Sequence, residues 1–174
     1  MKFAIKEYWE NLKVEYEATY NASIFSDYDV LKQYAEHFRT YLITLMCEYS
    51  NDVDVACTLA TVEQVLRHEE NSIQLLEEFL RKYIEELSDT EKARVYTNLA
   101  FYYNDEGNIK EYDYLYAAVK LNSPYIETYR GLALYHFSAY REKGSAEDLK
   151  KSLRAFERGI IVSNDYDINF GYAV

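Results

Sequence analysis

The sequence predicts an all-α fold, an α-α superhelix of stacked antiparallel helix pairs with about nine helices. Three observations predict it. Apolar side chains recur at spacings of three and four residues along most of the chain, which is the period of an amphipathic helix. The 174 residues include one proline and five glycines, too few for many short strands joined by tight turns. Apolar helix faces also superpose after shifts of 36 and 33 residues, which indicates an internal repeat.

The first half of the chain predicts three helices. The first carries a stripe of apolar residues at spacings of four, three and four: Ile5, Trp9, Leu12 and Tyr16. A second is expected to begin after Ser26 or Asp27, and residues 50–52 offer capping side chains for a third that closes at residues 68–70. We expect residues 1–50 to form an N-terminal helical cap within the same domain as a repeat array over residues 51–174.

Later helix starts are predicted by a capping side chain that precedes a glutamate or glutamine by three residues. This pattern occurs three times and places helix starts near 72, 89 and 109: Asn71 with Gln74, Ser88 with Glu91, and Asn108 with Glu111. Pro124 is expected in the first turn of the next helix. Seven extra residues in that repeat predict a longer helix or turn over residues 139–148, before a last helix that follows Gly144 and Ser145.

The central segment supplies an ordered set of aromatic, leucine, small, glycine and proline positions: Tyr96, Leu99, Ala100, Tyr103, Gly107, Tyr112, Tyr116, Val119 and Pro124. This order resembles the tetratricopeptide repeat (TPR) family, whose period is about 34 residues. Tyr112 and Val119 depart from it, because the family has small side chains there. The resemblance is close over residues 93–166, loose over 52–88, and absent as a motif before residue 50.

The resemblance implies that the first helices of successive repeats line a concave groove that binds a protein or an extended peptide. The corresponding groove residues are Arg94, Thr97, Asn98, Phe101, Asn104, Arg130, Leu134 and Phe137. Some family members clamp a terminal carboxylate with lysine, asparagine and arginine. That clamp is incomplete here, because Thr97 and Phe101 replace the lysine and one asparagine. The alternative interpretation is that the apolar groove residues pack against a neighbouring helix.

Charge and motifs exclude several classes of function. The net charge is −11, and residues 1–90 hold 18 acidic and 8 basic side chains, which disfavours nucleic acid and anionic membrane partners. No signal core or membrane span is visible, which indicates a cytoplasmic protein. His37, His68 and His136 are remote from one another in sequence, and no phosphate loop occurs. We therefore expect no metal, no cofactor and no catalytic residue, and hence no enzyme.

The sequence thus predicts a non-enzymatic scaffold or adaptor that binds a protein or peptide. The alternatives are a peptide-sensing regulator, a protein that neutralises a basic toxin, and a repeat domain that positions an attached enzyme. Residues 167–174 resemble the first turns of a further helix, so we expect the array to be truncated at its C-terminal end. Self-association through that uncapped helix is a further expectation.

Overall fold

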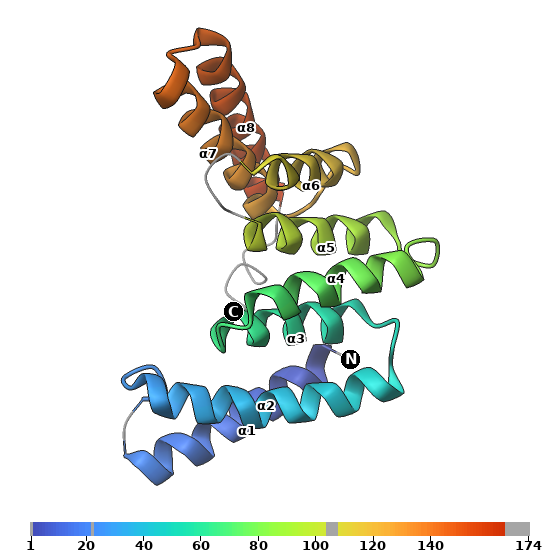
Figure 1. Ribbon diagram of the computed structural model, residues 1–174, viewed down its shortest axis with the longest axis vertical. Helices are drawn as coiled ribbons and strands as arrows, with labels where there is room; N and C mark the ends of the chain where they lie inside the picture. The colour runs from blue at the N-terminus through green and yellow to red at the C-terminus, as the bar shows by residue number, and fades with distance from the viewer. Residues whose placement is uncertain (1, 22, 104–107, 166–174) are drawn as a thin grey trace. The chain divides into compact units, whose positions relative to one another are not determined.

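The computed structural model describes residues 2–21, 23–103 and 108–165, and these residues form eight helices and no strand (Figure 1). The expected all-α fold is confirmed. The ninth expected helix falls on residues 167–174, outside the described residues. The helices are α1 (Lys2–Tyr20), α2 (Tyr28–Glu48), α3 (Val53–Val65), α4 (Glu69–Tyr83), α5 (Asp89–Tyr102), α6 (Ile109–Lys120), α7 (Ile126–Lys143) and α8 (Ala146–Asp165).

The helices belong to two compact units, which we call unit 1 (residues 1–83) and unit 2 (residues 84–174). In each unit, helices that follow one another in the chain pack together in pairs, α1 on α2 and α3 on α4 in unit 1, α5 on α6 and α7 on α8 in unit 2. Further contacts join α2 to α3 in unit 1, and α6 and α5 to α7 in unit 2. This consecutive pairing is the packing of an all-α helical repeat.

Local capping chemistry explains four of the helix starts. Asp27 and Asp52 accept backbone N–H bonds at the starts of α2 and α3. Ser88 and Glu91 form the complete reciprocal capping box at the start of α5. The Asn108 side chain caps α6 by accepting from the backbone N–H of Lys110. The predicted starts near 89 and 109 are therefore confirmed.

Two predicted boundaries are wrong. Helix α4 begins at Glu69 rather than near 72, because α3 already ends at Val65 and a tight turn follows in which Arg67 has a φ of 61°. Pro124 precedes α7 instead of forming its first turn, since Tyr125 is the N-terminal cap residue and its backbone N–H donates to the Ser123 hydroxyl. The predicted extension before the last helix is confirmed, because α7 is 18 residues long and is followed by Gly144, the C-terminal cap residue, in the left-handed conformation.

Aromatic side chains fill the seam between α1 and α2. The rings of Tyr8 and Tyr41 stack with centroids 3.7 Å apart. Trp9 meets Tyr34 and Phe38 edge-on, at 4.5 and 5.0 Å. Tyr34 is fully buried and its hydroxyl donates to the carbonyl oxygen of Trp9. These contacts fix α1 on the core of unit 1.

Unit 2 brings its helices together through small side chains. Ser152 of α8 is buried and its hydroxyl donates to the carbonyl oxygen of Ala133 in α7. A Cβ atom at Gly131 would lie 3.0 Å from the Leu115 side chain of α6. The larger residue at position 112 is accommodated because the Tyr112 ring stacks on Tyr116, with centroids 5.7 Å apart.

Among the described residues, no helix combines the length and apolar character that crossing a membrane requires.

Candidate functional site

The predicted groove residues of α7 form an exposed strip. Arg130, Leu134 and Phe137 follow one another at spacings of four and three, so they share one side of the helix. Leu134 is 50% exposed and Phe137 is 41% exposed. Arg130 is also exposed, and its guanidinium carbon lies 6.0 Å from the centre of the Phe101 ring of α5. We call Phe101, Arg130, Leu134 and Phe137 the α7 strip.

The predicted groove residues of α5 lie on two different sides of the helix. Arg94, Asn98 and Phe101 recur at spacings of four and three and are half-buried, so they share a stripe that ends at the α7 strip. Thr97 is 4% exposed and is therefore withdrawn from solvent. Asn104 lies outside the described residues. The structure thus brings Phe101 beside the α7 residues, continues that surface toward Asn98 and Arg94, and excludes Thr97 from it.

Thr97 serves the packing of α5 against α7. Its hydroxyl donates to the carbonyl oxygen of Ala93 and lies 2.7 Å from the hydroxyl of Thr128 in α7. The Thr128 hydroxyl lies 2.7 Å from that of Ser123. All three hydroxyl-bearing residues are buried. Because buried hydroxyls that lose their partners carry a free-energy cost, this chain of hydrogen bonds holds α5 and α7 in a fixed register.

The chemistry of the α7 strip is that of a recognition surface. Two half-exposed apolar side chains offer area that a partner can remove from water, at about 25 cal/mol per Å². The Arg130 guanidinium offers donors in a planar fork that suits a carboxylate or backbone carbonyls. Because the guanidinium already lies near the Phe101 ring, the Arg130 side chain samples fewer conformations and loses less conformational entropy when a partner binds. Arginine and aromatic residues together are typical of binding hot spots.

The sequence did not reveal a second cluster in unit 2, where α6, α7 and α8 meet. His136 of α7 is 8% exposed, and its Nδ1 lies 3.7 Å from a carboxylate oxygen of Asp148 in α8, too far for a hydrogen bond. The Tyr112 ring of α6 meets the imidazole edge-on at 5.8 Å. These groups are remote in sequence, so only the packing of three helices brings them together.

Burial controls ionisation in this cluster. It lowers the pKa of His136 below its usual value; the nearby charge of Lys151 acts in the same direction, and Asp148 opposes both. Burial also raises the pKa of Glu111 on α6 above its usual value. Folding therefore favours the neutral imidazole and the protonated carboxyl. A neutral buried histidine makes the free energy of unfolding fall as the pH falls below about 6.5, the pKa expected in the unfolded chain.

We expect His136→Gln to reduce this pH dependence. Between pH 7.5 and 5.5 the wild-type chain should lose stability, because its unfolded state takes up a proton that the folded state resists. Around and above pH 4.5 the raised pKa of Glu111 has the opposite effect on the free energy of unfolding. Glu111 is present in both the wild-type chain and the His136→Gln variant, so its effect cancels in the comparison. Urea unfolding followed by circular dichroism at the two pH values measures the loss. An equal loss in the wild-type chain and the variant would contradict the assignment to His136.

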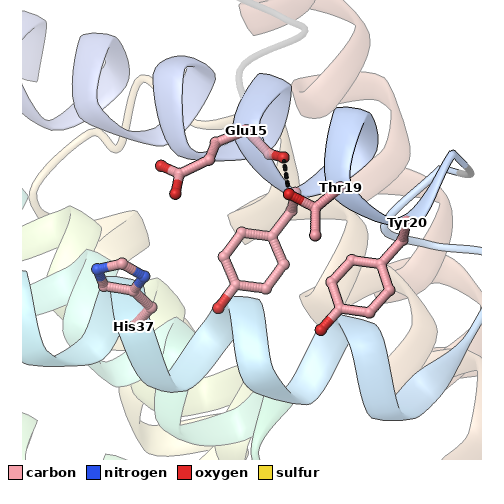
Figure 2. Close-up of a pocket in the computed structure, with 5 residues that line it drawn as sticks. Glu15, Thr19, Tyr20 and His37 are labelled. Atoms are coloured by element: carbon pink, nitrogen blue, oxygen red, sulfur yellow. Dashed lines mark hydrogen bonds between the residues drawn. The ribbon is translucent and has the colours of Figure 1, made fainter.

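A hollow of about 220 Å³ lies between α1 and α2 in unit 1, lined by Glu15, Tyr16, Thr19, Tyr20 and His37. Figure 2 shows the Glu15 carboxylate and the His37 ring on one side of it and Tyr20 on the other. The hydroxyls of Tyr16 and Tyr20 donate to Gln33 of α2, and Thr19 donates to the Glu15 carbonyl oxygen. The hollow is smaller than the roughly 300–1,000 Å³ of small-molecule sites, and its tyrosines anchor α1 to α2.

No group of three or more His, Cys, Asp or Glu side chains that could hold a metal ion occurs in the part of the chain that the structure describes. The α7 strip is the candidate site among the predicted groove residues, because it combines exposed apolar side chains with a guanidinium. Comparison with known proteins finds no matching family model, no matching curated protein and no matching solved structure, so the surface itself carries the functional argument.

Proposed function

We propose that this protein is a non-enzymatic scaffold that binds a protein or peptide through the α7 strip. The single observation that carries the proposal is the placement of Leu134 and Phe137, 50% and 41% exposed, on the same side of α7 as Arg130. Exposed apolar side chains that adjoin a guanidinium match the composition of protein-binding surfaces. The TPR resemblance of residues 93–166 supports the same role, and a cytoplasmic location is part of this proposal.

The chemistry of the strip supports one kind of ligand. Leu134 and Phe137 call for apolar side chains in the partner, and Arg130 calls for a carboxylate or a backbone carbonyl. In this proposal Arg94 and Asn98 extend the polar part of the surface along α5 and bind the backbone of an extended peptide. We therefore propose an extended peptide segment that combines apolar and acidic residues. Nucleic acids are not part of this proposal, because the net charge of −11 repels their phosphates.

We expect the double variant Arg94→Glu/Arg130→Glu to weaken peptide binding at least tenfold, because the substitutions replace attraction for carboxylates with repulsion. A display library of random peptides provides the probe: peptides are selected on the wild-type protein, synthesised, and measured by calorimetry on both proteins. The matched control is Arg158→Glu, an exposed arginine of α8 that lies outside the strip.

The apolar part of the site is tested by Leu134→Ala/Phe137→Ala on the same selected peptides. Both side chains are at least 41% exposed, so their truncation should leave the circular dichroism spectrum unchanged while binding weakens. Selected peptides that bind the wild-type protein, both strip variants and the control with equal affinity would exclude the α7 strip as the binding site.

A further inference from the structure

Helix α8 has two apolar faces, of which α7 covers one. The covered face holds Ser152, Ala155, Gly159 and Val162, all of which are buried. A Cβ atom at Gly159 would lie 3.2 Å from the Cβ of Tyr129, which shows how closely α7 approaches this face. The other face carries the residues that we call the α8 stripe: Leu149, Leu153, Phe156 and Ile160.

The α8 stripe is exposed. Leu153 is 53% exposed, Phe156 41% and Ile160 59%, while Leu149 is half-buried. Its spacings of four, three and four are those of a seam between two packed helices. At roughly 100° per residue, the stripe lies roughly 110° around the helix from the face that contacts α7. Among the described elements, α8 packs against α7 alone, so no described helix covers the α8 stripe.

The charges beside the stripe point to its occupant. Lys150 and Glu157 are exposed and lie on the same flank of the stripe, one toward each end of it. When two identical helices pair antiparallel about a two-fold axis, equivalent flanks meet. Lys150 of one copy then faces Glu157 of the second copy, and the same pair forms twice. The stripe is thus complementary to itself.

The charge balance of α8 agrees with pairing between identical helices. The chain as a whole has a net charge of −11, which opposes association of two copies over most surfaces. Helix α8 is neutral, with as many acidic as basic residues: Glu147, Asp148, Glu157 and Asp165 against Lys150, Lys151, Arg154 and Arg158.

We propose that two copies of this chain associate through their α8 stripes as an antiparallel, two-fold symmetric pair. The proposal goes beyond peptide binding and uses a different helix from the α7 strip. Four side chains from each copy bury less area than the roughly 800 Å² per partner of a standard interface, so the dimer is weak and reversible. Its formation therefore depends on protein concentration in the micromolar range or above.

Charge exchange tests the proposed pairing. Lys150→Glu puts a glutamate opposite Glu157 of the second copy, and this repulsive pair forms twice. We expect the dissociation constant of the dimer, measured by sedimentation equilibrium, to rise about tenfold. Lys150→Glu/Glu157→Lys restores opposite charges and should return the dissociation constant to within about threefold of the wild-type value. Arg158→Glu on the far side of α8 is the charge-matched control, and we expect it to change the constant by less than about twofold.

Phe156→Glu tests the apolar seam and should abolish dimerisation, while circular dichroism checks that the chain stays folded. A wild-type protein that remains monomeric up to millimolar concentration would overturn the proposal. So would a dimer that tolerates Phe156→Glu, or a double exchange that fails to restore association. A wild-type monomer that dimerises only after deletion of residues 166–174 would also overturn it, because that segment and not a second copy would then occupy the α8 stripe.

Discussion

Arg39→Met should lower the free energy of unfolding of unit 1 by about 3 kcal/mol, because it removes a charged partner from a buried carboxylate. The Glu63 side chain is 4% exposed, and one of its oxygens lies 2.6 Å from Nε of Arg39. Its other oxygen lies 2.8 Å from Nδ1 of His68. Without Arg39, the carboxylate retains one of these two partners and part of its desolvation cost is no longer offset. Urea unfolding followed by fluorescence of Trp9, the one tryptophan of the chain, measures the change.

A second substitution separates lost charge pairing from lost packing. In the Arg39→Met background, Glu63→Gln removes the buried charge, and we expect it to recover part of the stability. In the wild-type background the same Glu63→Gln substitution should be destabilising, because it weakens the bond from Arg39. Arg81→Met, at an exposed arginine of α4, is the control for removing a guanidinium from the surface. If Arg39→Met costs no more than Arg81→Met, the ion pair does not stabilise unit 1.

This ion pair illustrates what the sequence could not predict. Arg39 and Glu63 are 24 residues apart, on α2 and on α3, and each alone resembles an ordinary surface charge. By contrast, Asp52 and Ser88 act on backbone N–H groups within three residues, so the starts of α3 and α5 were predictable from local chemistry. Asn71 misled the prediction of α4, because it lies within the first turn of the helix although asparagine is favoured at the N-cap.

The candidate site shows the same division. The periodicity of α7 predicts that Arg130, Leu134 and Phe137 share a side, because that relation depends on one helix alone. The exposure of that side depends on where α5, α6 and α8 pack, which periodicity does not determine. Thr97 was expected in the groove, but it is adjacent to Asn98 and so points roughly 100° away from it, toward Thr128. The His136 cluster needs three helices and was missed for the same reason.

Because α7 and α8 approach each other closely, we expect Gly159→Val to lower the free energy of unfolding by about 3 kcal/mol. A Cβ atom at this position would lie 3.2 Å from Cβ of Tyr129 and 3.8 Å from Cγ1 of Ile126. Tyr129 is 2% exposed and its hydroxyl donates to the Ser123 carbonyl oxygen, so its ring has no room to withdraw. The two γ-methyl groups of valine therefore force the helices apart.

A series of substitutions separates this steric effect from helix propensity. Gly159→Ala adds one methyl group and gains roughly 1 kcal/mol of helix propensity, which offsets its tight contact and leaves the stability nearly unchanged. Arg158→Val, at the adjacent exposed position, measures the propensity cost of a β-branched residue in α8, a few tenths of a kcal/mol. Urea unfolding followed by circular dichroism compares the three variants. If Gly159→Val costs no more than Arg158→Val, then α7 and α8 are not held together at this position, because tightly packed helices cannot absorb two added methyl groups without loss of stability.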